Sequence, residues 1–194
     1  MEIIGICGGS CSGKSSIVNA LTNQLTNLTV VHFDDFFIGK DKLEDKDIKN
    51  WEDPSLYRLN DYENTLKKLK QNEGIVIEAN SRESKHEGIK TRVIKPNDYV
   101  VVEGFLTFYT PESRKYFDKK IYLDIPEEEI IKRRYERMKN GGGYYSDEYI
   151  RKTLIEEHRK NVLPQKQFAD LVVDATKTSE EMVDEVLAFI TKPK

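Results

Sequence analysis

Gly8-Gly9-Ser10-Cys11-Ser12-Gly13-Lys14-Ser15 matches the phosphate-binding pattern Gly-x4-Gly-Lys-Ser/Thr at every fixed position. The apolar run at residues 3–7 before it is typical of a buried strand, and a helical pattern begins at Ser16. In this context the backbone N–H groups of residues 8–16 are expected to surround phosphate oxygens. Lys14 would reach the outer phosphates, and the Ser15 hydroxyl would ligate Mg²⁺. The stretch therefore predicts a binding site for a magnesium nucleoside triphosphate.

Length and composition fit one domain spanning residues 1–194. The 31 basic and 34 acidic residues give a net charge of −3, which argues against a surface for nucleic acid. Cys7 and Cys11 fall in the first strand and the phosphate loop, so neither a disulfide framework nor a zinc site is expected. The start of the chain leaves no room for a signal peptide, and no apolar run approaches the ~18 residues of a membrane span. We expect a cytoplasmic protein with no membrane partner; its oligomeric state stays open, a homo-oligomer included.

Strand-like and helical runs alternate along the rest of the chain, which predicts a mostly parallel α/β sheet in a three-layer fold of the P-loop NTPase type. Further strands are expected at residues 29–33, 99–104, 120–124 and 171–174, and helices after Ser55, Pro126, Ser146 and Ser179, with Pro164 ending the third of these. Two β-prone runs within about residues 74–95 predict a small hairpin. Arg133, Arg134 and Arg137 precede a glycine break at 141–143, which predicts an arginine-bearing lid over about residues 133–147.

Acidic residues follow two of the expected strands. Asp34 and Asp35 end the strand at 29–33, and Glu103 ends the strand at 99–103. Because ligands of open parallel sheets bind at the carboxyl ends of strands, these groups should lie near the phosphate loop. Glu103 is expected to hold Mg²⁺ together with Ser15, and Asp34 is a candidate base or metal partner.

Two other parts of the sequence are less informative. Residues 39–50 form an expected exposed loop that could order over a substrate. His32, His86 and His158 show no metal-ligand spacing and receive no role; His32 is expected to satisfy a neighbouring polar group.

The candidate residues together suit phosphoryl transfer to a hydroxyl, which needs a bound triphosphate, a base and positive charge. Two features favour a kinase over a GTPase-like switch. An acid, rather than a switch threonine, follows the second strand, and arginines precede a glycine hinge. The guanine-reading Asn-Lys-x-Asp motif of GTPases is absent from the sequence. The alternative from another class is a non-catalytic, nucleotide-dependent switch or regulatory module.

Several motifs resemble the uridine kinase family, in that family's order: the phosphate loop, Asp34-Asp35-Phe36-Phe37, Asn50-Trp51-Glu52-Asp53-Pro54, Val102-Glu103-Gly104-Phe105, Arg133-Arg134-x-x-Arg137 and Leu163-Pro164-x4-Phe168-Ala169-Asp170. The resemblance implies a salvage enzyme that uses ATP and Mg²⁺ to phosphorylate the 5′-hydroxyl of uridine or cytidine. It implies that Asp34 is the catalytic base, that Ser15 and Glu103 serve the metal, and that Glu52 and Arg134 hold the ribose hydroxyls. Lys14 and Arg137 would act on the phosphates.

The sequence departs from that family at two places. Asn80-Ser81-Arg82 stands where uridine kinases carry a Tyr-Asp-Phe-x-x-His stretch, and Gly142-Gly143-Tyr144 replaces an Arg-Gly-Arg lid tip. The chain is also similar to nicotinamide riboside kinases, whose substrate is a cationic ribonucleoside. Aromatic faces attract such cations, and the candidates are Trp51, Tyr57, Tyr144 and Tyr145.

Overall fold

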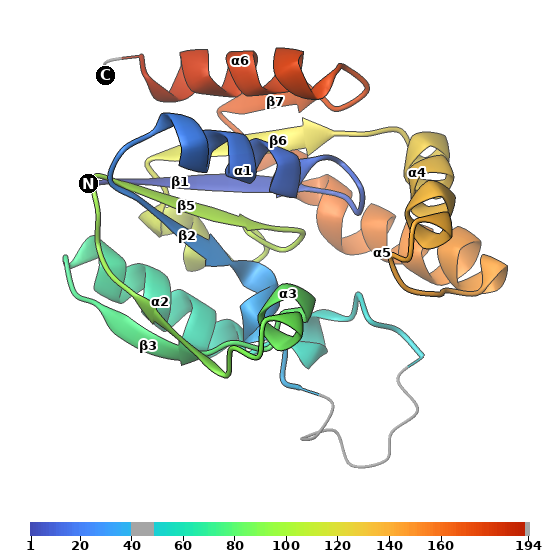
Figure 1. Ribbon diagram of the computed structural model, residues 1–194, viewed down its shortest axis with the longest axis horizontal. Coiled ribbons are helices and arrows are strands. Elements are labelled where there is room, and N and C mark those ends of the chain that lie inside the picture. The colour runs from blue at the N-terminus through green and yellow to red at the C-terminus, as the bar shows by residue number, and fades with distance from the viewer. Residues whose placement is uncertain (40–48, 193–194) are drawn as a thin grey trace.

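The computed structural model describes residues 1–39 and 49–192, and its centre is a sheet of five parallel strands in the order β2-β5-β1-β6-β7 (Figure 1). The strands are β1 (Glu2–Gly8), β2 (Leu28–His32), β5 (Tyr99–Gly104), β6 (Lys119–Asp124) and β7 (Leu171–Asp174). The structure thus confirms the predicted parallel α/β sheet. All five carboxyl ends face the same edge, where the phosphate loop leaves β1.

Helices cover both faces of this sheet. The helices α1 (Lys14–Gln24) and α6 (Ser179–Ile190) pack on one face, while α2 (Leu59–Lys70) packs on the other (Figure 1). Alternate residues of β1 point to opposite faces, so Ile4 and Ile6 join the core under α1 whereas Ile3 and Cys7 join the core under α2. Because both faces are covered, the strands are apolar almost throughout, as parallel strands commonly are.

A small antiparallel hairpin lies beside α2, as the sequence predicts. It consists of β3 (Ile75–Glu78) and β4 (Thr91–Ile94), with Val76 opposite Val93. A short helix, α3 (Arg82–His86), lies between the two strands. No pattern in the sequence predicts α3, because a helix of five residues carries too few apolar positions to show a period.

The helical region after residue 146 is less regular than expected. The helix α4 (Glu127–Lys139) ends before the glycine break, and the Ser146 hydroxyl accepts a hydrogen bond from the Tyr149 N–H (3.1 Å) at the start of the next helical run. That run contains two π-helical turns, η5 (Tyr149–Leu154) and η6 (His158–Val162), on either side of α5 (Ile155–Glu157). The run ends at Val162, next to the expected end at Asn161, and a separate 3₁₀ helix, η7 (Leu163–Phe168), begins there with Pro164 in its first turn, where a proline loses no helical hydrogen bond.

Short 3₁₀ helices connect the remaining elements: η1 (Phe33–Phe36), η3 (Pro54–Leu56) and η4 (Ser113–Tyr116). The prediction of a helix capped by Ser55 is wrong, because Asp53 Oδ1 accepts from the Ser55 N–H (2.8 Å) to start η3, and α2 begins at Leu59. Residues 40–48 of the expected substrate loop lie outside the described residues. Among the helices that the structure describes, none has the length and apolar character of a membrane span.

Candidate active site

The phosphate loop at residues 8–15 joins β1 to α1. Lys14 Nζ donates hydrogen bonds to the backbone oxygens of Gly8 and Gly9, both at 2.9 Å, so the ammonium group lies inside the curve of the loop. Gly13 has a φ of 95° and Cys11 a φ of 60°, left-handed conformations that produce the tight turn. The first turn of α1 follows directly, which directs unpaired N–H groups and partial positive charge to the same place. The loop can therefore hold an anion such as a phosphate.

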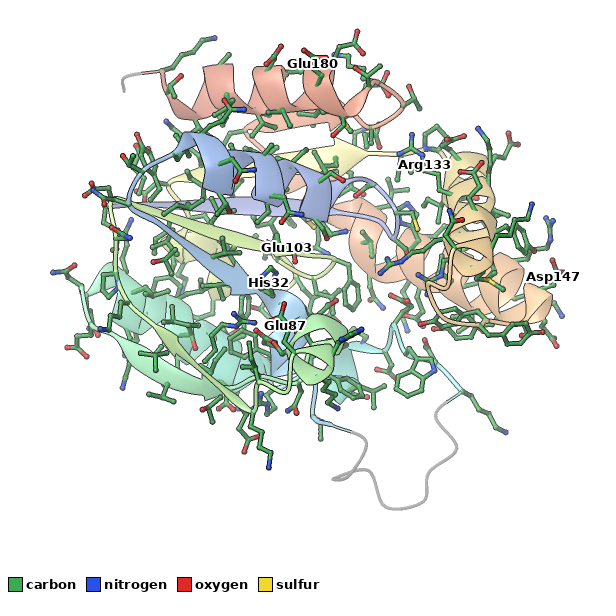
Figure 2. The ribbon with its side chains drawn as sticks, viewed as in Figure 1. His32, Glu87, Glu103, Arg133, Asp147 and Glu180 are labelled. Carbon is green, nitrogen blue, oxygen red and sulfur yellow. The ribbon has the colours of Figure 1, made fainter. Side chains whose placement is uncertain are left out.

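Glu103 and His32 lie side by side at the edge of the sheet next to this loop. In the strand register Glu103 is opposite Ile6 of β1 and opposite His32 of β2. The nitrogen His32 Nδ1 is 2.8 Å from Glu103 Oε1, and Figure 2 shows the two side chains together at the centre of the molecule. Burial alone would lower the pKa of His32, but the hydrogen bond and charge of Glu103 outweigh it and raise the pKa. The polar neighbour expected for His32 is thus the carboxylate expected to serve the metal.

Asp34 and Asp35 follow β2 in η1, but their surroundings differ sharply. Asp34 is exposed, whereas Asp35 is completely buried. The carboxylate of Asp35 accepts hydrogen bonds from Ser81 N (3.1 Å), Ser84 Oγ (2.7 Å) and Arg92 Nε (3.1 Å). Asp35 therefore anchors the hairpin region to η1, and this contact fixes the backbone that carries Asp34.

Glu52, which precedes η3, and Arg134 of α4 interact electrostatically. Arg134 is 6% exposed, and its guanidinium carbon lies 4.0 Å from the ring centroid of Tyr145. Within the described residues Arg134 Nε has no hydrogen-bond partner. Burial raises the pKa of the half-buried Glu52, and the charges of Arg134 and Lys14 oppose this rise only in part. Glu52 is thus within electrostatic reach of both α4 and the phosphate-loop lysine.

The three arginines of α4 have different surroundings. Arg133 donates from Nε to Glu129 Oε1 (2.8 Å) and from a terminal nitrogen to the backbone oxygen of Cys11 (3.3 Å), and its position is labelled in Figure 2. Arg137 is exposed, and its Cγ lies against Gly142 at the end of the helix. The structure therefore brings Arg133 to the phosphate loop and places the charge of Arg134 within electrostatic reach of Glu52, whereas Arg137 lies at the outer end of α4.

Comparison with known proteins places this geometry in a family. The model of the phosphoribulokinase/uridine kinase family matches residues 3–181. The chain belongs to this family. A uridine kinase of Borrelia duttonii (strain Ly) is 32% identical over 182 residues, which cover 89% of this chain and 86% of that relative.

Solved structures agree on the P-loop kinase fold. A possible uridine kinase from Bacillus stearothermophilus superposes with a TM-score of 0.59 at 21% identity, covering 89% of this chain and 88% of that one. A shikimate kinase from Bacteroides thetaiotaomicron gives a TM-score of 0.60 at 12% identity, covering 98% of this chain and 99% of that one. These two likenesses concern the fold, and the family membership rests on the sequence matches.

The residues of this family member fit a bound magnesium triphosphate. Lys14 has backbone oxygens as its partners and can exchange them for phosphate oxygens, while Ser15 is exposed at the start of α1. No group of three or more His, Cys, Asp or Glu residues that could hold a metal ion occurs within residues 1–39 and 49–192. This is compatible with the predicted site at Ser15 and Glu103, because Mg²⁺ commonly takes its remaining ligands from phosphate and water.

The sequence analysis missed several residues around the site. Trp51 N donates to Tyr149 Oη (3.1 Å), and Asn50 Nδ2 donates to Glu157 Oε1 (3.0 Å), so the segment carrying Glu52 is attached to the helical run that follows α4. His158 is buried against the phosphate loop. The motif Asn50-Trp51-Glu52 identified the first residues of the contacts with Tyr149 and Glu157. Nothing in the sequence predicted these two partners, which lie about a hundred residues away.

Proposed function

We propose that this protein is an ATP-dependent kinase that phosphorylates the 5′-hydroxyl of a ribonucleoside, with uridine or cytidine as the acceptor. The observation that carries the proposal is that Glu52 lies within electrostatic reach of both Arg134 and the phosphate-loop Lys14. A kinase needs an acceptor group within reach of the donor phosphates, and a carboxylate beside a guanidinium can bind neighbouring hydroxyls as acceptor and donor together. The curated relatives called uridine kinase support the choice of acceptor.

In the proposed mechanism each residue has a separate task. The loop N–H groups and Lys14 hold the triphosphate, while Ser15 and Glu103 would hold Mg²⁺, which neutralises charge on the phosphates when bound. Asp34, exposed at the end of β2, accepts the proton of the attacking 5′-hydroxyl. Arg134 orients the ribose together with Glu52, and Arg137 faces the phosphates only if the end of α4 moves inward on binding.

A nicotinamide riboside kinase is the second candidate. One observation favours it: Tyr57, whose pKa is raised first by burial, also lies within reach of the charges of Asp34 and Glu52 and of the side chains Tyr145 and Tyr149. Aromatic rings and carboxylates together suit a cationic base. Against it, the face of Tyr145 already carries the guanidinium of Arg134, and Tyr57 stacks on Phe33 with ring centroids 5.0 Å apart.

The test is a panel of nucleosides, including uridine, cytidine and nicotinamide riboside, incubated with Mg-ATP while released ADP is measured. We expect uridine or cytidine to stimulate ADP release most strongly. Asp34→Asn should lower acceptor-dependent turnover at least a hundredfold while leaving ATP affinity nearly unchanged, since general-base catalysis contributes about 10²–10⁴-fold. Stimulation by no acceptor would instead favour the non-catalytic switch, and unchanged turnover in the variant would remove Asp34 as the base.

A further inference from the structure

His158 is a buried polar residue with no part in the mechanism above. Its side chain is 4% exposed, and its Nδ1 has no hydrogen-bond partner among the residues that the structure describes. Burial lowers the pKa of His158; the charge of Glu127 opposes this effect in part, and the charge of Lys14 adds to it. A buried ring nitrogen without a hydrogen-bond partner costs stability, and such a cost is commonly retained where the group serves a function.

The imidazole of His158 lies directly against the phosphate loop. A Cβ atom built on Gly9 would be 2.9 Å from both Cε1 and Nδ1 of the ring and 3.2 Å from Cδ1 of Ile130. Real Cβ atoms essentially never come that close to another atom. The ring therefore leaves room only for glycine at position 9, and it fixes how far the loop backbone can approach the helical run.

The preceding residue, Glu157, contacts the acceptor side. Its Oε1 accepts from Asn50 Nδ2 (3.0 Å), and its other oxygen accepts from Asn161 Nδ2. Asn50 in turn accepts a hydrogen bond through Oδ1 from the backbone N–H of Glu52 (3.0 Å). A short chain of contacts thus leads from Glu157 to the residue proposed to bind the ribose.

We propose that Glu157 and His158 are positioning residues that hold the two halves of the site in register: His158 sets the phosphate loop through Gly9, and Glu157 sets Glu52 through Asn50. Successive residues of a helix point in directions about 100° apart, so one turn can contact two segments that are distant in sequence. The acceptor half of this inference rests on the proposed function. The triphosphate half does not, because it concerns only the phosphate loop.

The triphosphate half is tested with Gly9→Ala, His158→Ala and the double variant, using isothermal titration calorimetry with the magnesium complex of the non-hydrolysable analogue AMP-PNP. Gly9→Ala should weaken binding at least tenfold, and the double variant should bind within threefold of His158→Ala. Lys160→Ala, an exposed neighbour on the same helical run, is the matched control and should bind as the wild type does. A loss that persists in the double variant would overturn the contact. If Gly9→Ala does not fold, recovery of a folded double variant supports the contact and continued failure overturns it.

The acceptor half is tested by Glu157→Gln against the exposed neighbour Glu156→Gln. Glu157→Gln should raise the acceptor KM about five- to tenfold and leave AMP-PNP affinity within twofold, whereas His158→Ala should change AMP-PNP affinity more than acceptor KM. Equal changes in both quantities, or a lower Tm with neither changed, would show a merely structural role. If the wild type phosphorylates no acceptor, the proposed function and this half fail together, while the AMP-PNP affinities still decide the role of His158.

Discussion

The same substitution, aspartate to asparagine, should lower the free energy of unfolding at Asp35 and lower turnover at the adjacent Asp34. Asp35→Asn keeps the size of the side chain but removes its charge and one acceptor oxygen from a completely buried position. Three donors depend on that carboxylate: Ser81 N, Ser84 Oγ and Arg92 Nε, at 2.7–3.1 Å. Asp34→Asn changes an exposed side chain, so it should alter turnover rather than the free energy of unfolding.

The expected loss for Asp35→Asn follows from these contacts. Breaking a buried ion pair by removing one partner costs about 3–5 kcal/mol. The Arg92 side chain is 28% exposed and can regain water, so the lower end of that range applies here, about 3 kcal/mol. For a chain of this length each kcal/mol lowers Tm by roughly 2–4 °C, which predicts a decrease of roughly 6–12 °C.

Urea unfolding and thermal melts followed by circular dichroism measure both variants. Hydrogen exchange adds a local readout, because the backbone N–H of Ser81 should lose protection in Asp35→Asn but not in Asp34→Asn. The reasoning is refuted if Asp35→Asn unfolds within about 1 kcal/mol of the wild type, or if Asp34→Asn is destabilised as much.

Two further predictions concern Glu52 and Gln165. Burial raises the pKa of Glu52 above the usual carboxyl value of 4.5, and only the ionised form would accept hydrogen bonds from the ribose hydroxyls. As the pH decreases, kcat/KM for the acceptor should therefore begin to fall at a pH above 4.5. Glu52→Gln should abolish this acid limb of the pH profile. Gln165 is buried, donates to the oxygens of Phe105 (2.8 Å) and Asn161 (2.7 Å) and accepts from Phe108 N (2.7 Å). Gln165→Leu should therefore cost about 2–4 kcal/mol in urea unfolding, and a loss below about 1 kcal/mol would contradict this.

The sequence predicted those parts of the molecule whose signal is local. The phosphate loop is defined by consecutive residues, and the parallel sheet follows from apolar runs that alternate with helical patterns. Once the sheet is parallel, the carboxyl ends of β2 and β5 lie side by side, and Asp34 follows β2 while Glu103 lies at the end of β5, so both are expected near the loop. These elements depend on short-range periodicity and on one rule of topology, so they need no knowledge of side-chain packing.

The parts that the sequence did not predict depend on contacts between distant segments. The hydrogen bond from Trp51 to Tyr149 joins residues 98 positions apart, and the contact between Gly9 and His158 is longer still. Asp35 was paired with Asp34 in the sequence, and only its burial reveals that it anchors the hairpin region. A lone histidine in a helical stretch has no pattern that separates a structural role from a functional one.

The π-helical turns η5 and η6 make the number of residues in this segment as important as their identity. A π turn holds an extra residue compared with an α turn, and deleting one residue within η5 would let the helix return to regular geometry. The π turn absorbs its extra residue within one turn, so the side chains before and after it would keep about the same directions around the helix axis. A residue added ahead of Glu157 in regular helical geometry is not absorbed in this way, and every following side chain would rotate by about 100°. Glu157 would then leave Asn50 and His158 would leave Gly9, although the sheet and its strands stayed unchanged. The segment can thus accept substitutions at exposed positions such as Lys160, and it can lose a residue only within a π turn.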